Sequence, residues 1–334
     1  MDWFERLTGF REEAYDLTRA KLVAEGARLR SLVNNRSFQV GELELVSLQQ
    51  LRQRAQRVQV GGVPVRVRNV IGEARKLHRD PQHAGSLIQV ASQFNLLEMV
   101  SEEVTPADGV TGYRYDPTQG PACAIAAGAA TIYRNYFAQT PDDQLDAIRD
   151  LGLGLAGGIG CSIDDLWKMR NGYAMCTPEG LGRIGSYLKS VDEDERDRLR
   201  SLLRIGLHWD VEVTDQTAED FSQGPILSQA FCSALPISYC GFKSPHWEIW
   251  ATLVLEAAYE ATVLAGVINT EKNMGAPGAN RVLLTLLGGG AFGNSPAWIT
   301  SAIKRAIDVV AESGLQIDLV SHREIPRSLL VLER

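Results

Sequence analysis

The stretch RVLLTLLGGGAFGNSPAW, residues 281–298, decides the fold that we expect for this chain. Residues 281–287 are mostly apolar and end at a glycine run, which predicts a buried β-strand. Ser295 and Pro296 predict the start of a helix, because serine is a favoured N-cap and proline suits the first helical position. The glycines between them are more numerous than a tight turn requires. We therefore expect a strand, a loop whose backbone amides bind an anion, and a helix.

Working outward from this stretch, apolar periodicity predicts further strands and helices. We expect strands at 65–70, 86–92, 211–214, 234–239 and 316–321, and helices at 122–136, 247–268 and 296–312. Strands that alternate with helices over this length predict a layered α/β sheet.

Two segments lie outside that alternation. Residues 1–60 are rich in Arg, Glu, Leu and Gln, and they predict a helical N-terminal extension before a main domain at 61–334. Residues 150–205 combine a glycine-rich run with a charged helix, and we interpret them as a helical insertion. These glycines lack the spacing and the following Lys-Ser/Thr of a phosphate-binding loop, so nucleotide binding is not expected there.

Composition excludes several classes of protein. Hydrophobic residues at 45% and charged residues at 22% are close to the averages of globular proteins. A net charge of −7 without a Lys/Arg run argues against nucleic acid as a partner. The five cysteines are an odd number without a C-x-x-C pair, which indicates a reducing compartment. The N-terminus lacks the apolar core of a signal peptide and no stretch predicts a membrane span, so we expect a cytoplasmic protein.

Two common hydrolytic mechanisms lack their motifs. The five histidines show no H-x-x-x-H spacing, which argues against a zinc hydrolase. No G-x-S-x-G stretch is present, which argues against a serine hydrolase. We therefore expect neither a metal nor a cofactor.

The stretch EEVTPADGVTGYRYDPTQGP, residues 102–121, is the second candidate for chemistry. It holds four carboxylates in a loop that precedes a predicted helix start. Carboxylates serve glycosidic chemistry by orienting water, by binding ribose hydroxyls or by protonating a leaving group. For Glu102 and Glu103 a role as solvated loop charges is equally compatible with the sequence. Asp108 and Asp116 lie among glycine and aromatic residues, which favours a functional role.

These two loops resemble those of macrodomains. Gly-Gly-Gly-Ala-Phe-Gly-Asn before an amphipathic helix and a closing strand is similar to the second phosphate loop of the branch that resembles poly(ADP-ribose) glycohydrolase. Residues 108–121 resemble the MavL-type group of bacterial effector hydrolases, which remove ADP-ribose from an arginine of ubiquitin. The resemblance spans about residues 65–325. It implies a three-layer α/β/α macrodomain-like fold with a mixed sheet.

The resemblance also implies roles for individual residues. Asp108, Asp116 and Glu103 are the catalytic candidates. The residues expected to bind ADP-ribose are Glu73 and His322 at the adenine, Phe94 and Asn95 at a ribose, and, around the diphosphate, Thr118, Gln119, Gly120, Gly288, Gly289, Gly290, Ala291, Phe292, Gly293 and Asn294.

The sequence departs from the poly(ADP-ribose) glycohydrolase pattern, in which two adjacent glutamates directly follow a Gly-Gly-Gly run. Here Ala291 and Phe292 follow the glycines, and Glu102-Glu103 lacks a glycine context. We therefore expect a hydrolase that removes mono-ADP-ribose, arginine-linked, from a modified protein, with ubiquitin as a candidate. The alternatives are a macrodomain that reads ADP-ribose without cleaving it, or one that sequesters a nucleotide signal. If the protein is an effector, its location is the cytosol of a host.

Overall fold

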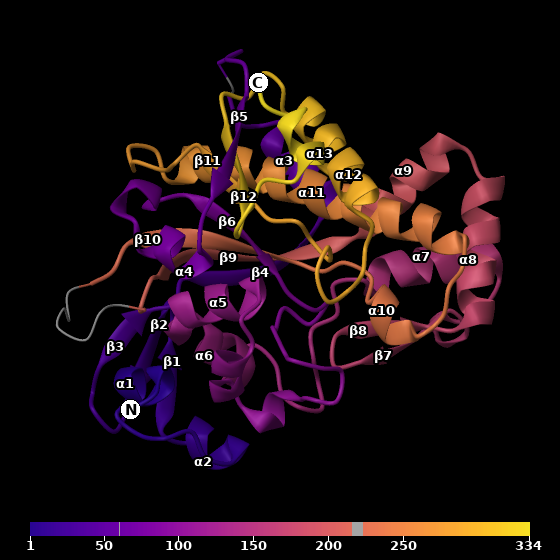
Figure 1. Ribbon diagram of the computed structural model, residues 1–334. Coiled ribbons are helices and arrows are strands. Elements are labelled where there is room, and N and C mark those ends of the chain that lie inside the picture. Colours follow the sequence, from indigo (N-terminus) through magenta and orange to yellow (C-terminus); the bar gives the residue numbers. More distant parts are fainter. Residues whose placement is uncertain (60, 216–222) are drawn as a thin grey trace.

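The computed structural model describes residues 1–59, 61–215 and 223–334 and is built around a seven-stranded mixed sheet (Figure 1). The strands, in their order across the sheet, are β4 (Glu42–Ser47), β9 (Arg204–Glu212), β10 (Ile226–Cys232), β6 (Leu87–Ala91), β11 (Arg281–Leu284), β12 (Gln316–Ser321) and β5 (Arg66–Ile71). The four pairs from β10 to β5 are parallel, whereas β4–β9 and β9–β10 are antiparallel. The carboxyl ends of β10, β6 and β11 therefore meet at one edge.

Helices cover both faces of this sheet (Figure 1). One face carries α3 (Leu48–Ala55), α11 (His246–Lys272) and α12 (Pro296–Val309); the other carries α4 (Ala74–Arg79), α5 (Gln119–Ala126) and α6 (Gly128–Tyr136). The side chains of β11 alternate between the two cores, with Val282 and Leu284 in one and Leu283 in the other. The expected α/β class with a mixed sheet in three layers is confirmed.

Helix α11 is long and apolar enough to cross a membrane by length and composition. However, 83% of its most apolar window is buried inside the protein, and Trp250, Val254 and Ala258 belong to the larger hydrophobic core. This helix is the central packing element on its face of the sheet.

The prediction of a helical N-terminal extension is right only in part. Residues 1–59 do contain three short helices, α1 (Trp3–Thr8), α2 (Tyr15–Arg19) and α3. They also form a three-stranded antiparallel sheet made of β1 (Leu22–Glu25), β2 (Arg28–Ser31) and β3 (Ser37–Gln39). Strand β4 is an edge strand of the main sheet, so the main fold begins before residue 61. The charged residues of β2 and β4 alternate with Leu29, Leu43 and Leu45, a period-two pattern that the Arg/Glu-rich composition obscures.

The insertion is only partly helical. It comprises α7 (Arg149–Ile159), the hairpin β7 (Trp167–Arg170) and β8 (Tyr173–Cys176), α8 (Pro178–Ser190) and α9 (Glu193–Leu202). Its glycine-rich run is part of α7 and forms no loop. Asn171 and Gly172 have positive φ angles of 44° and 83° and make the hairpin turn.

Other predicted boundaries also shift. The strand expected at 234–239 is wrong, because Pro236 has no amide hydrogen for a ladder and residues Ile237–Cys240 form the short helix α10. The strand expected at 211–214 is the end of β9, and the helix at 122–136 is divided into α5 and α6 at Ala127. Strand β11 ends at Leu284, which leaves Thr285 to Leu287 in the loop.

Buried His78 on α4 predicts sensitivity to acid. Its Nδ1–H donates to the Ala74 carbonyl at 2.7 Å, and its Nε2 lies 3.0 Å from the Gln229 amide nitrogen. Burial lowers the pKa of His78 from 6.5 to about 4. Because the folded-state pKa lies below the unfolded one, the stability contributed by the neutral ring is present above pH 6.5 and is lost as the pH falls toward 4.

We expect the titration of His78 alone to lower the free energy of unfolding by about 2 kcal/mol when the pH falls from 7 to 5. Urea denaturation at the two pH values measures the loss, and a His78→Leu variant, although less stable at pH 7, should lose less on acidification. An equal loss in the variant and the unchanged protein would contradict this assignment.

Candidate functional site

Two adjoining cavities lie at the carboxyl ends of β6, β10 and β11 and form one cleft. The first cavity, of about 200 Å³, includes Ala91 and Cys232 in its lining. The second, of about 230 Å³, lies between α4 and the ends of β6 and β11. Thr118, Gln119 and Thr285 line both cavities. Together the cavities reach the volume typical of sites for small-molecule ligands.

The start of α5 forms one wall of the first cavity. Thr118 is the N-cap residue, and its side chain caps no backbone amide. The Gln119 side chain accepts from the Ala91 amide at 2.9 Å and donates to the Gln89 carbonyl at 2.8 Å, so it fastens the helix to β6. A Cβ atom on Gly120 would lie 2.1 Å from the Ala91 carbonyl oxygen, so only glycine permits this approach. Pro121 has no amide hydrogen and the Ala122 amide donates to the Thr118 carbonyl at 3.3 Å, so the first-turn amides that can attract an anion are those of Gln119 and Gly120, which line the cavity.

The glycine-rich loop after β11 forms the opposite wall. Gly288 has a φ of 69°, and its carbonyl accepts from the Asn294 amide at 2.9 Å, which closes the loop on itself. Within the described part of the chain, the amides of Gly290, Ala291 and Phe292 donate to no protein acceptor. All three residues line the cavity. Consecutive free amides of this kind make an anion-binding concavity.

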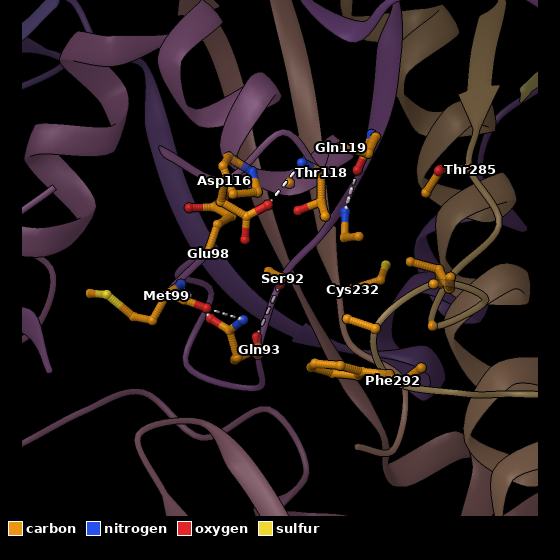
Figure 2. Close-up of a pocket in the computed structure, with 18 of the residues that line it drawn as sticks. Ser92, Gln93, Glu98, Met99, Asp116, Thr118, Gln119, Cys232, Thr285 and Phe292 are labelled. Atoms are coloured by element: carbon orange, nitrogen blue, oxygen red, sulfur yellow. Dashed lines mark hydrogen bonds between the residues drawn. The ribbon is translucent and has the colours of Figure 1, made fainter. Parts of the chain in front are cut away.

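Two carboxyl groups line the same cavity, and Figure 2 shows both on the side opposite Phe292. Half-buried Asp116 lies two residues before Thr118, the N-cap residue of α5, and its Oδ1 accepts from the Thr118 amide at 2.8 Å. Glu98 lies deeper, with its side chain fully buried. The anion-binding walls and these carboxyl groups therefore share one cavity.

Glu98 is held by a buried arginine of α6. The Arg134 Nη2 atom lies 3.1 and 3.3 Å from the two Glu98 carboxyl oxygens, and neither side chain has exposed surface. The guanidinium also packs 3.9 Å from the centre of the Phe231 ring. Burial raises the pKa of Glu98 to about 7, and Arg134 opposes this rise. At neutral pH this carboxyl group can therefore either donate or accept a hydrogen bond.

An aromatic cluster closes the far end of the first cavity. Phe292 of the glycine loop, Tyr239 of α10 and Tyr173 of β8 contact one another, with ring centres 5.2 to 5.6 Å apart. The Tyr173 hydroxyl donates to the Met99 carbonyl at 3.0 Å. The insertion thereby supports the glycine loop through its hairpin.

The second cavity is a mainly apolar slot with a polar rim. Leu77, Ile88 and Leu283 are among its walls. Glu73 and His322, both predicted at the adenine, line it together and are solvent-accessible. An ion pair with Lys76 at 3.0 Å lowers the pKa of Glu73 and keeps it an acceptor. Apolar walls with polar groups at the rim suit an aromatic ring with a polar edge.

Three predicted acidic and polar positions are not brought to the cleft. Asp108 is exposed and accepts from the Thr105 amide and hydroxyl at 2.8 and 2.9 Å, so it closes a capping box. Glu103 lines a separate open groove and forms an ion pair with Arg170 at 3.8 Å. Buried Asn95 donates to Gln144 at 2.8 Å. The catalytic assignments of Asp108 and Glu103 and the ribose assignment of Asn95 are therefore corrected.

The remaining corrections concern apolar residues and the glycine loop. Phe94 is 2% exposed and belongs to the hydrophobic core. Asn294 is buried and donates to the Leu235 carbonyl at 2.9 Å, so it shapes the loop from behind. Gly289 and Gly293 do not line the cavity and face Ile299 and Ser238. The predicted residues that do line the cleft are Glu73, Asp116, Thr118, Gln119, Gly120, Gly288, Gly290, Ala291, Phe292 and His322.

The sequence analysis missed the Glu98–Arg134 pair and the tyrosines of the aromatic cluster. One signal was available: Arg134 interrupts an apolar helix, and an arginine on a buried helix face requires a buried acidic partner. Nothing local identifies that partner as Glu98. For metals, the described ranges contain no group of three or more His, Cys, Asp or Glu side chains able to hold an ion.

No protein-family model and no curated protein matches the chain. Among solved structures, poly(ADP-ribose) glycohydrolase from Thermomonospora curvata is similar at 13% identity, with 90% of each chain covered and a TM-score of 0.45. Poly(ADP-ribose) glycohydrolase from Deinococcus radiodurans in complex with ADP-ribose is similar at 10% identity, covering 86% of this chain and 90% of that one, with a TM-score of 0.44. The function is therefore argued from the cleft itself.

Proposed function

We propose that this protein is an ADP-ribosyl hydrolase that binds ADP-ribose along the cleft and releases it from a modified protein. The observation that carries the proposal is the first cavity, in which free amides of the glycine loop face the start of α5 beside two carboxyl groups. Backbone amides on both walls bind a diphosphate, and carboxyl groups beside it serve a ribose.

The two cavities suggest a place for each part of the ligand. The adenine occupies the apolar slot, with Glu73 accepting from its amino group and His322 covering the ring. The diphosphate lies between Gly290–Phe292 and the first turn of α5. The second ribose then lies in the first cavity, against Asp116 and Glu98.

The proposed reaction breaks the bond between ribose C1 and a nitrogen of the modified protein. Asp116 takes a proton from a water whose oxygen bonds to C1 as the C–N bond breaks, and that proton then passes to the departing nitrogen. Glu98 binds the ribose hydroxyls, because at neutral pH its carboxyl group can donate a hydrogen bond or accept one. These steps need no metal ion and no redox cofactor.

The finer proposal is that the bond is an arginine-linked mono-ADP-ribose, with ubiquitin as the candidate carrier. In support of this linkage, the Asp116 carboxyl group lines the first cavity, where its negative charge would attract a departing guanidinium. No glutamate pair follows the glycine run, so the arrangement expected for cleavage of the polymer is missing from the sequence.

The test combines binding with release. Calorimetry should detect ADP-ribose binding, with AMP as the comparison ligand. Release of ADP-ribose is then measured from arginine-ADP-ribosylated ubiquitin, from serine-linked mono-ADP-ribosylated protein and from poly(ADP-ribose). Release from the arginine-linked substrate supports the full proposal, and release from the polymer instead overturns the finer part. Binding without release from any substrate makes the protein a reader, and no binding overturns the proposal entirely.

A further inference from the structure

The loop that carries Asp116 is held by a residue distant in sequence, Glu12. The Glu12 carboxylate accepts from the Val110 amide at 2.8 Å, from the Thr111 amide at 2.8 Å and from the Thr111 hydroxyl at 2.6 Å. It also accepts from the Tyr136 hydroxyl at 2.8 Å. Four donors from the loop and α6 thus converge on one carboxylate, and such charge-assisted hydrogen bonds are the stronger kind.

Glu12 caps a short helix in this loop whose own N-cap residue has no polar side chain. The short 3₁₀ helix Thr111–Tyr115 has Val110 at its N-cap position, and a valine side chain cannot accept from the first amides. Glu12 supplies that cap from the N-terminal segment. The helix ends at Tyr115, and the amide of the next residue, Asp116, donates to the Tyr113 carbonyl at 3.2 Å. The position of the Asp116 backbone is therefore fixed by a helix that Glu12 caps.

Two further contacts show that the N-terminal segment fits this loop closely. Gly109 has a φ of 77°, and a Cβ atom there would lie 2.4 Å from the Glu12 carboxyl carbon. Only glycine leaves room for the carboxylate to reach both amides. Two residues before Asp116, Arg114 forms an ion pair with Asp2 at 3.3 Å.

The segment that carries Glu12 is itself fixed. The Glu13 amide donates to the hydroxyl of fully buried Thr18 at 2.9 Å, and that hydroxyl donates back to the Glu13 carbonyl at 3.0 Å. Trp3, Phe4 and Leu7 of α1 share a hydrophobic core with α6. Glu12 therefore projects from a rigid support.

We propose that Glu12 is a positioning residue: through the 3₁₀ helix it caps, it holds Asp116 at the ribose end of the cleft. This inference rests on the proposed function, because it assigns Glu12 to the same reaction. It also gives the N-terminal segment a role in catalysis, although no residue of that segment lines the cleft.

The test replaces Glu12 by Gln, which keeps the shape but offers one acceptor oxygen where the carboxylate has two. We expect kcat for release of ADP-ribose from arginine-ADP-ribosylated ubiquitin to fall by about 10- to 100-fold. The affinity for ADP-ribose should be nearly unchanged, because the glycine loop is a separate segment and Gln119 fastens the start of α5 to β6 independently of Glu12. The stoichiometry of ADP-ribose binding counts the folded fraction, so a loss of folded protein cannot imitate the fall in kcat.

Glu13→Gln is the matched control. Glu13 is the neighbouring residue, it forms an ion pair with Lys21 at 2.6 Å, and its side chain is 45% exposed. This variant should release ADP-ribose at the unchanged rate. Hydrogen exchange of residues 108–116 should quicken in the Glu12 variant and not in the Glu13 variant.

A double variant separates positioning from a general loss of stability. If Glu12 acts through Asp116, Glu12→Gln should lower the rate no further in an Asp116→Asn background. An additive loss there, or an unaffected kcat in the Glu12 variant, overturns this inference while the proposed function stands. Absence of release by the unchanged protein overturns the proposed function, and this inference with it.

Discussion

Replacing Asp116 by Asn should slow the release of ADP-ribose by about 10²- to 10⁴-fold, the usual contribution of a positioned acid or base. The amide keeps the hydrogen bond from Thr118, which Asp116 accepts at 2.8 Å, so the start of α5 should stay in place. What is lost is the ability to take a proton from water. Single-turnover release from arginine-ADP-ribosylated ubiquitin measures the effect, and calorimetry should show ADP-ribose affinity to be retained.

Asp108→Asn provides the matched control within the same loop. Asp108 is exposed, accepts from the Thr105 amide and hydroxyl, and is not among the residues that line the cleft. An asparagine there can still accept from Thr105, so this variant should release ADP-ribose at nearly the unchanged rate. The reverse result, with Asp108→Asn inactive and Asp116→Asn active, would return the catalytic role to the residue that the structure places outside the cleft.

The sequence predicts those parts of the fold that depend on interactions between residues close together in the chain. The strand before Gly288, the Ser295-Pro296 helix start and the alternation of later elements depend on apolar periodicity, capping and backbone freedom within a few residues. The anion loop and the start of α5 belong to this group, and they do face each other across the cleft.

The parts that could not be predicted depend on contacts distant in sequence. Asp108 and Asp116 occupy equally suggestive surroundings in the sequence. The structure separates them because residues 105–108 form a capped turn at the surface, while residues 111–115 form the helix that leads to the cleft. Glu98 contacts Arg134 only because α6, which is distant in sequence, packs against the segment that carries Glu98. No sequence pattern in either segment predicts the contact between Glu98 and Arg134.

The N-terminal segment shows the same limit at the level of the fold. In composition, the charged residues of β4 are also typical of a solvent-exposed helix. Only the pairing of β4 with β9 shows that this segment is a strand and that Leu43 and Leu45 lie against the core. The role of Glu12 is similarly invisible in sequence, because its partners lie about a hundred residues away.

Replacing Arg134 by Met should lower the free energy of unfolding by about 3–5 kcal/mol at pH 8, because one member of a fully buried ion pair is removed. Glu98 would then be a buried carboxyl without its cationic partner, which raises its folded-state pKa further above the present value of about 7. A carboxyl group with a raised folded-state pKa destabilises the fold as the pH rises through that range. The loss in Arg134→Met should therefore be larger at pH 8 than at pH 6.

Two controls make this stability prediction specific. Adding Glu98→Gln to Arg134→Met removes the uncompensated charge, so the double variant should be more stable at pH 8 than Arg134→Met alone, and its stability should depend less on pH. Arg198→Met breaks the surface pair with Glu195, a contact of 2.6 Å with the arginine side chain 51% exposed, and should cost no more than about 1 kcal/mol. Urea denaturation at pH 6 and pH 8 measures all of these variants. The prediction fails if Arg134→Met lowers the free energy of unfolding no more than Arg198→Met does. The buried Glu98–Arg134 pair would then not stabilise the fold, and Arg134 would not be needed to hold Glu98 in the first cavity.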